Sequence, residues 1–418
     1  MNIMLNNLGK KIIIFELISF LYIKIVTYYV PFFKVTELIF DFVNVFLILF
    51  LIFSNHPSKL FFRLFVPIFF LLIFCVVRYF YSDSSLTLFL WGIRNVFRFL
   101  LFFYSSIIFL TQVELVNIFH KMYVCLLINV PLITFQFING VGRDYLGGTF
   151  GVEKNSNAVV NVFLISLVTY FLILFITKKI DIKKLIVVVG CSFYWAVLAE
   201  LKIFFIELFF SLFICVFFIR GNLLSKLKIL ILGFLLFTIS VALLYFAYPE
   251  QVVFVVNPSS IIWYLNNVHG GAYGFGRTTA FQIINSVFFN SELYKLLFGV
   301  GVGAAEYIDV FNYNLFSDFY KQYNEYAYNG YFYSMIYIQM GLLGLFWYCY
   351  IWMCTFVASL KLRAINRRFF YFSIIFSFLM LLLAFKDSTL LISISGYLSF
   401  FLFSIPYICL KTKSKEYC

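Results

Sequence analysis

The stretch LFFRLFVPIFFLLIFCVV, from Leu60 to Val77, decides the fold class because it is apolar on every side of a helix. A transmembrane strand would alternate apolar and polar residues over about 10 positions, and this stretch does not alternate. Similar runs follow one another through the 418 residues, of which only 12% are charged. Since about 20 mainly apolar residues cross the hydrocarbon core as a helix, the sequence predicts an all-α polytopic membrane protein.

About twelve transmembrane helices are expected, joined by polar connections. Basic residues gather in the connections KKIDIKK (Lys178 to Lys184), RGNLLSKLK (Arg220 to Lys228) and KLRAINRR (Lys361 to Arg368), and in the tail KTKSK from Lys411. By the positive-inside rule these segments are cytoplasmic, and the count of spans then places both termini in the cytoplasm. The expected spans are 11–31, 36–53, 60–80, 88–110, 114–138, 158–177, 185–199, 203–219, 229–248, 329–358, 369–385 and 389–410.

The cysteines and histidines predict no metal site and no cofactor. Nearly all of the eight cysteines lie inside apolar runs without CxxC spacing. The three histidines, His56, His120 and His269, are scattered without the spacing of metal ligands. The net charge of +13 comes largely from the cytoplasmic connections, so no nucleic-acid partner is expected.

The same topology predicts one integral membrane domain, 1–418, with two notable segments on the outer side. Residues 140–157 form a short outer loop, and residues 249–328 form a long outer loop that is too long for a simple connector. The long loop is expected to be partly helical and to serve as a lid or substrate-binding region. Its apolar positions at helical spacing predict an amphipathic helix that lies on the membrane or covers a cavity. These positions are Ala280, Phe281, Ile284, Val287 and Phe288.

Two arginines with nearby glycines stand out in these outer loops. Arg143 precedes YLGGTFGVEKNSNA (Tyr145 to Ala158), and Arg277 ends the run HGGAYGFGR. Glycine allows backbone amides to approach a ligand, and the planar guanidinium fork suits phosphate oxygens. Together they predict a pyrophosphate site at the outer surface. Alternatively, the glycines only form turns and the arginines face water or lipid headgroups.

Glu200 and Lys202 occupy a short turn, AELK, between two apolar segments. Charge at a helix end near the membrane is costly unless it is paired or faces water. The pattern therefore predicts either a functional carboxylate–lysine pair or a plain turn whose side chains extend to the interface.

Arg94 and Arg98 lie four residues apart in WGIRNVFRFLLF, on one helix face and about one turn inside the membrane. Arginines in that position usually face a cavity, where they could bind an anionic headgroup. Pairing with Asp83 or another acid is the alternative explanation.

Two glycine patterns and a tyrosine-rich segment have structural explanations. GVGVG (Gly299 to Gly303) lacks the GK[ST] of a nucleotide loop, so no nucleotide site is predicted. Gly341 and Gly344, one helical turn apart, favour close helix packing over ligand binding. The tyrosines between Tyr320 and Tyr337 could stack on sugar rings or form an interfacial aromatic belt.

Several of these motifs occur together, in one order, between Arg143 and Trp347. They are YLGGTFGVEKNSNAVV, AELK, GRTTAFQIINSVFFNSELYKLLFGVGVG and YNGYFYSMIYIQMGLLGLFW. This ordered set resembles bacterial O-antigen and capsular polysaccharide polymerases (Wzy-type), which are related to the O-antigen ligases. The resemblance implies an inverting, metal-independent glycosyltransferase of the bacterial plasma membrane. Its expected partners are an undecaprenyl-pyrophosphate-linked glycan, membrane lipid and other membrane proteins of polysaccharide assembly.

The resemblance also implies that Arg143 and Arg277 bind the substrate pyrophosphate. Lys202, Arg94 and Arg98 are further candidates for the anionic group. Many relatives carry a histidine just before the Gly-Leu-Leu-Gly helix, where this chain has Tyr328 and Asn329. The candidate catalytic groups are therefore Glu200, Glu325 and His269. Two other functions stay open: a ligase that transfers glycan to an acceptor, and a flippase or transporter for lipid-linked oligosaccharides.

Overall fold

The computed structural model describes residues 2–29, 36–53, 59–82, 84–153, 156–219, 223–247, 259, 275–310 and 313–416. Each of the twelve predicted spans falls on a helix, with ends that mostly differ by a few residues. These helices are α1 (Asn2–Tyr29), α2 (Thr36–Phe53), α3 (Lys59–Tyr79), α4 (Leu86–Phe109), α5 (Gln112–Ile138), α6 (Ser156–Ile176), α7 (Ile182–Leu198), α8 (Lys202–Phe218), α9 (Leu223–Ala247), α15 (Phe332–Lys361), α16 (Arg367–Lys386) and α17 (Ser393–Glu416).

Six helices in the described part of the chain are long and apolar enough to cross a membrane, namely α4, α5, α6, α15, α16 and α17. Helices α7 and α8 have only 17 residues each, slightly fewer than the roughly 20 of an ordinary span. The helical membrane fold is thus confirmed, whereas the number of twelve crossings stays a prediction.

The core of the bundle lies around α6 and α17. Helix α6 is buried along nearly its whole length and contacts α7, α8, α16 and α17. Helix α17 packs against α4, and Lys411 near its end donates hydrogen bonds of 2.7 to 2.8 Å to the carbonyls of Ile107, Ile108 and Leu110. A cation at the C-terminal end of a helix satisfies carbonyls that have no partner within the helix. This contact secures α4 against α17.

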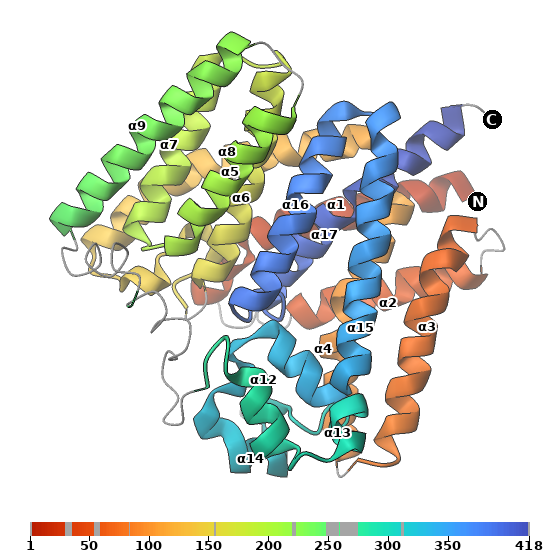
Figure 1. The fold of residues 1–418 in the computed structure, drawn as a ribbon. Helices are drawn as coiled ribbons and strands as arrows, with labels where there is room; N and C mark the ends of the chain where they lie inside the picture. Colours follow the sequence, from red (N-terminus) through yellow and green to blue (C-terminus); the bar gives the residue numbers. More distant parts are fainter. Residues whose placement is uncertain are drawn as a thin grey trace.

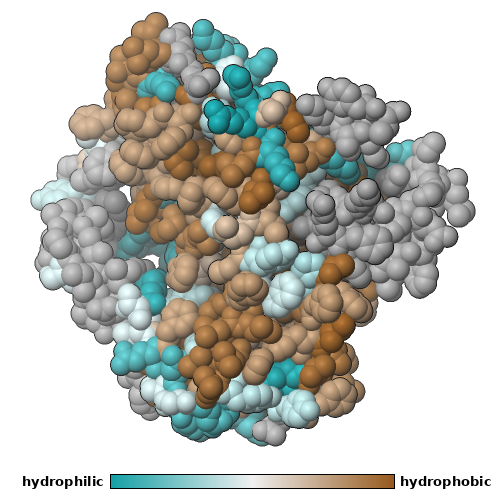
Figure 2. Space-filling model, turned by 45° about the vertical axis from the view of Figure 1, so that its right-hand side comes forward, coloured by the Kyte–Doolittle hydropathy of each residue, from teal (hydrophilic) through white to brown (hydrophobic). Residues whose placement is uncertain are grey.

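The exposed surface along the sides of the helical bundle carries many apolar residues. Large exposed side chains include Phe46, Phe70, Phe217 and Phe234. Figure 2 shows a broad hydrophobic area on one face, with hydrophilic residues gathered above it and along the bottom edge. A soluble protein rarely exposes so large an apolar area, and lipid is the environment that suits it.

The segment 140–157, predicted as a short outer loop, packs against α5 in its described part. It forms two single turns, η2 (Arg143–Tyr145) and η3 (Gly148–Phe150). Gln136 of α5 binds the backbone N–H and C=O of Gly148 at 2.9 and 3.1 Å, and Asn129 accepts from the Thr149 N–H at 2.7 Å. The backbone N–H groups of Gly148 and Thr149, which the glycine pattern predicted to face a ligand, therefore donate their hydrogen bonds to side chains of α5.

Residues 275–310 and 313–331, most of which fall in the predicted long outer loop, form a cap on the bundle. It contains α12 (Ala280–Ile283), a π-helical turn η4 (Ile284–Phe288), α13 (Leu293–Phe298), a hairpin of β1 (Tyr307–Val310) and β2 (Tyr313–Phe316), and α14 (Asp318–Tyr323). Figure 1 shows α12, α13 and α14 at one end of the molecule, beside α3, α4 and α15. The sequence predicted an all-helical protein and did not predict this antiparallel hairpin. The described residues therefore form a helical fold with one small two-stranded sheet.

The predicted amphipathic helix is present at residues 280–288. Its residues Ala280, Ile284 and Phe288 are buried in an aromatic cluster that also contains Tyr331 and Tyr337. The apolar face thus packs on the beginning of α15, as expected for a helix that covers part of the protein.

A break in α15 joins the cap to the bundle. Gly341 has φ +63°, which interrupts the helix, and the carbonyls of Ile338 and Gln339 accept hydrogen bonds from Val300 and Gly301 at 2.8 and 3.0 Å. The glycines of GVGVG all have positive φ, a conformation that other residues adopt only with strain. GVGVG is thus a structural loop, and the close packing expected at Gly341 is confirmed by its contact with the Leu297 backbone.

Substitution of Gly299 tests this junction. Gly299 has φ +72°, and a Cβ atom there would lie 2.4 Å from the carbonyl carbon of Gln339. Gly299→Ala should lower the free energy of unfolding by at least about 2 kcal/mol, because backbone strain of about 1–3 kcal/mol adds to the clash. Thermal unfolding in detergent, followed by tryptophan fluorescence, measures the effect.

Gly190 provides the matched control, because it lies inside α7 and a Cβ atom there meets nothing within 4 Å. Gly190→Ala should leave stability unchanged or raise it by up to about 1 kcal/mol. Equal unfolding midpoints for the two variants would contradict the structural role of Gly299.

Candidate functional site

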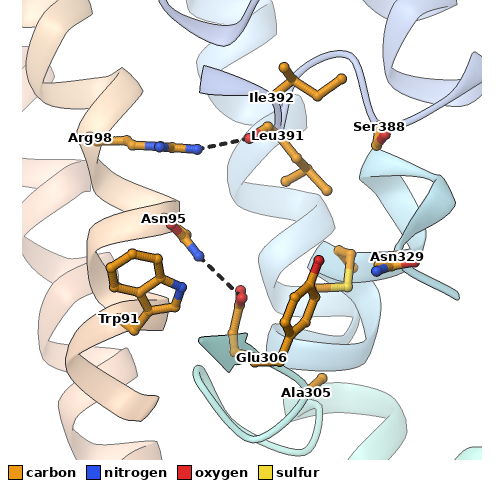
Figure 3. A pocket seen from close by; sticks show the side chains of 11 residues that line it. Trp91, Asn95, Arg98, Ala305, Glu306, Asn329, Ser388, Leu391 and Ile392 are labelled. Atoms are coloured by element: carbon orange, nitrogen blue, oxygen red, sulfur yellow. Dashed lines mark hydrogen bonds between the residues drawn. The ribbon is translucent and has the colours of Figure 1, made fainter. Parts of the chain in front are cut away.

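A cavity of about 340 Å³ lies where the cap meets the bundle. Figure 3 shows side chains from α4, from the segment before β1 and from the connection between α16 and α17 around it. Its lining residues are Trp91, Asn95, Arg98, Ala305, Glu306, Tyr307, Asn329, Met335, Ser388, Leu391 and Ile392. Charged, amide and aromatic groups thus share one small space with aliphatic side chains, as in many small-molecule sites.

Helix α4 contributes the polar side of the cavity. Trp91, Asn95 and Arg98 are spaced by four and three residues, which places them on one helix face. The Arg98 guanidinium donates a 2.9 Å hydrogen bond to the Leu391 carbonyl and lies 4.5 Å from the centre of the Phe99 ring. These contacts hold a largely buried cation at the cavity wall.

Glu306 faces Asn95 from the opposite side of the cavity (Figure 3). It follows the GVGVG loop and is only 8% exposed. Its two carboxylate oxygens accept hydrogen bonds from Asn95 at 3.1 Å and from Gln339 at 2.7 Å. Two amide donors on two helices thus fix the orientation of one buried carboxyl group.

Burial raises the pKa of Glu306. Hydrogen bonds from Gln339 and Asn95 and the charges of Arg98 and Arg94 oppose this effect without cancelling it. A carboxyl group with a raised pKa and a fixed orientation suits general acid–base chemistry, because its proton affinity is closer to neutral pH. The nearby guanidinium can stabilise negative charge, and the Trp91 and Tyr307 rings provide faces for an apolar or sugar surface.

Arg94 does not approach the same ligand as Arg98. Its Nε and Nη2 atoms both lie 2.6 Å from one carboxylate oxygen of Asp41 in α2, and its Nη1 donates to Asn95 at 3.2 Å. Of the two explanations that the sequence left open, pairing with an acid is therefore observed for Arg94, whereas binding of an anionic group by Arg94 and Arg98 stays a prediction. Asp83, the acid named above, lies outside the described residues.

Arg143, a predicted phosphate-binding residue, forms an ion pair with Glu200, a predicted catalytic residue. Their closest atoms, Nη1 and Oε1, are 2.5 Å apart, and the Arg143 side chain is about half exposed. Lys202 is exposed at the first residue of α8. Glu200 is thus paired with an arginine from another segment of the chain, and the choice between a functional carboxylate–lysine pair and a plain turn stays a prediction.

Arg277 lies beside one edge of the cavity. Its Nε donates a 2.9 Å hydrogen bond to the Lys386 carbonyl, and its guanidinium lies 5.6 Å from the Tyr331 ring centre. Ser388, two residues after Lys386, lines the cavity. Neither Arg277 nor Arg143 lines the cavity itself, so their shared pyrophosphate site stays a prediction.

Neither of the two candidate catalytic groups that the structure describes, Glu200 and Glu325, lines this cavity. Glu325 is exposed in the single turn η5 (Asn324–Tyr326) and is not a lining residue. His269 lies outside the described residues. The two residues at the position of the relatives' histidine are closer: Asn329 lines the cavity, and the Tyr328 hydroxyl donates a 2.8 Å hydrogen bond to the Ala305 carbonyl.

Comparison with family models, curated proteins and solved structures found no match to this chain. Within the described ranges, no three histidine, cysteine, aspartate or glutamate side chains are grouped as a metal site would require.

The raised pKa of Glu306 predicts a pH dependence of stability. The folded protein holds a proton on this group at pH values where the unfolded chain, with a pKa near 4.5, has lost it. The free energy of unfolding should therefore fall as the pH rises from the unfolded pKa through the folded one, by at most about 1.4 kcal/mol per pH unit.

Glu306→Gln should remove this contribution, because glutamine has no titrating proton. Unfolding midpoints of both proteins between about pH 4 and about pH 8 measure the difference. Parallel curves would contradict the raised pKa.

Proposed function

We propose that the protein is a polysaccharide repeat-unit polymerase that joins undecaprenyl-pyrophosphate-linked oligosaccharides on the outer face of the bacterial plasma membrane. The observation that carries the proposal is the cavity in which Glu306, Arg98 and the rings of Trp91 and Tyr307 meet. A carboxyl group, a guanidinium and aromatic faces are the groups that bind sugar hydroxyls, anionic leaving groups and sugar rings. The resemblance of the ordered motifs supports the same class of reaction.

In this proposal Glu306 is the general base. It accepts the proton of an acceptor hydroxyl while that oxygen forms a bond to the anomeric carbon of the donor sugar. The bond from the anomeric carbon to the pyrophosphate oxygen breaks, and its electron pair leaves with the pyrophosphate. In-line attack inverts the anomeric centre and needs both substrates held in alignment.

The arginines stabilise the leaving group in the same scheme. Arg98 places its guanidinium at the cavity wall, where it donates to the Leu391 carbonyl. Arg277 is held beside the edge of the cavity by its hydrogen bond to the Lys386 carbonyl. Arg143, together with Lys202, is proposed to contact the lipid-linked substrate elsewhere on the outer side. Fixed cations near developing negative charge lower the barrier because they need no reorganisation during the reaction.

Asn95 and Gln339 are positioning residues for Glu306. Each donates one hydrogen bond to a different carboxylate oxygen, and Arg94 holds Asn95 through its amide oxygen. The Asp41–Arg94 ion pair thereby acts on the base without touching the substrate.

Glu306→Gln and Arg98→Ala should each abolish long glycan chains while the protein still inserts into the membrane. Loss of a general base lowers the rate by about 10²- to 10⁴-fold, which leaves mainly single repeats. Gel analysis of surface glycan from a deletion strain carrying each variant measures chain length. Glu292→Gln is the control, because Glu292 is a half-exposed residue that pairs with Lys295 outside the cavity.

Normal chain length in both the Glu306 and the Arg98 variants would refute the assignment. Full-length polymer that is not attached to its acceptor would instead identify the ligase.

A flippase or transporter is the second candidate, because carboxyl–amide pairs lie inside the helices. Asn161 of α6 donates a 2.9 Å hydrogen bond to Glu207 of α8, and Asn44 of α2 donates one of 3.2 Å to Glu16 of α1. All four side chains are buried. Ionisable groups inside a membrane often lie on transport pathways.

Glu207→Gln separates the two candidates, since it preserves size and removes the ionisable group. Glu207 does not line the cavity, so a polymerase should keep its normal chain-length distribution. Quantification of lipid-linked single repeats, on sealed vesicles of known orientation, provides the second measurement. Their accumulation on the cytoplasmic side would favour the flippase.

A further inference from the structure

The hairpin beside the cavity carries an aromatic platform formed by Tyr307, Phe316 and Tyr320. Tyr307 of β1 and Phe316 of β2 are direct partners in the antiparallel register, so their side chains share one face. Their rings stack with centres 6.3 Å apart, and the Tyr320 ring lies 4.6 and 5.5 Å from them. Three rings therefore form one continuous apolar surface.

The platform is partly exposed to solvent, and hydrogen bonds hold the backbone that carries it. Tyr307 and Phe316 are 38% and 37% exposed, whereas Ile308, on the other face of the strand, is 6% exposed. The Ser317 hydroxyl accepts from the Tyr320 N–H at 3.0 Å at the start of α14. The Ser317 N–H donates to the Glu306 carbonyl at 3.3 Å. The backbone that carries the platform is thus bonded to the residue that carries the proposed base.

The platform is continuous with the cavity through Tyr307, which belongs to both. At about 340 Å³ the cavity is near the lower end of small-molecule sites, which span roughly 300–1,000 Å³. An oligosaccharide with one sugar beside Glu306 must therefore extend beyond the cavity. Sugar rings present C–H faces that pack on aromatic rings, while their hydroxyl groups remain in water.

We infer that the aromatic platform binds the acceptor glycan, at the sugars that follow the one in the cavity. This inference rests on the proposed polymerase function and adds a binding subsite to it. A chain that is held beyond the reacting sugar stays bound between transfers, so the platform sets how long the product becomes. The reacting groups at Glu306 and Arg98 lie in the cavity, which Phe316 of the platform does not line.

Phe316 is the residue to test, because it belongs to the platform and does not line the cavity. Phe316→Ala should shift the glycan length distribution to shorter chains while transfer of single repeats continues. Phe316→Tyr keeps an aromatic ring and should preserve the wild-type distribution. Phe80→Ala is the control, since Phe80 is another exposed aromatic residue, 76% exposed, that is not part of the platform.

Phe316→Leu distinguishes glycan binding from contact with lipid. Leucine keeps apolar bulk for packing and for a membrane surface, but it lacks the ring face that a sugar requires. If the inference is correct, Phe316→Leu shortens the chains as Phe316→Ala does. Wild-type chain length with Phe316→Leu would overturn it, even if Phe316→Ala proves too unstable to fold.

Direct binding provides the second measurement. The probe is the repeat-unit oligosaccharide, released from its lipid carrier by mild acid, and the protein is the full chain in lipid nanodiscs. Loss of one aromatic contact should weaken binding by roughly 3- to 10-fold in Phe316→Leu, as measured by saturation-transfer NMR. Unchanged affinity would overturn the inference.

Failure of the inference and failure of the proposed function give different results. If the platform is not a subsite, Phe316 variants make wild-type chains while Glu306→Gln still loses them. If the protein is not a polymerase, Glu306→Gln also leaves chain length unchanged.

Discussion

The site depends on a break in one helix and on the loop that fills it. Gly341 interrupts α15, and the carbonyls of Ile338 and Gln339 accept hydrogen bonds from the GVGVG loop. A buried backbone carbonyl or N–H without a hydrogen-bond partner is costly. The amides of Val300 and Gly301 in the GVGVG loop supply partners for carbonyls at the break. The same junction brings the Gln339 side chain to Glu306 and holds the start of β1 beside α4.

Charge in this protein is distributed by pairing. Arg94 is neutralised by Asp41, and Arg143 by Glu200, whereas Arg98 binds a backbone carbonyl at the cavity wall. The charges of both Arg98 and Arg94 lower the pKa of Glu306, and the charge of Arg98 has the larger effect. Arginines that look equivalent in the sequence therefore differ in what they can offer an anionic substrate. The electrostatic character of the cavity comes from Arg98 and Glu306, with Arg94 acting on it through Asn95.

Much of the helical framework followed from hydropathy, and little of the site did. Apolar runs predicted a helix at each expected span, because a helix satisfies its own backbone hydrogen bonds in lipid. Arg98 was found because an arginine inside an apolar helix is unusual. Glu306 was missed because it looks like any other acidic residue of the outer loop. Its place directly after a glycine-rich loop was the available signal, but the partners that bury and orient it come from α4 and α15.

What the sequence alone determined is the helical membrane fold class and the amphipathic helix at residues 280–288, because apolar period and length are local properties of the chain. Tertiary structure alone decided which charged groups pair, where the cavity lies and which carboxyl group faces it. Asn95 and Glu306 are 211 positions apart in the chain and 3.1 Å apart in the structure. Burial and the pKa shift that follows from it depend on such distant contacts, and no local pattern encodes them.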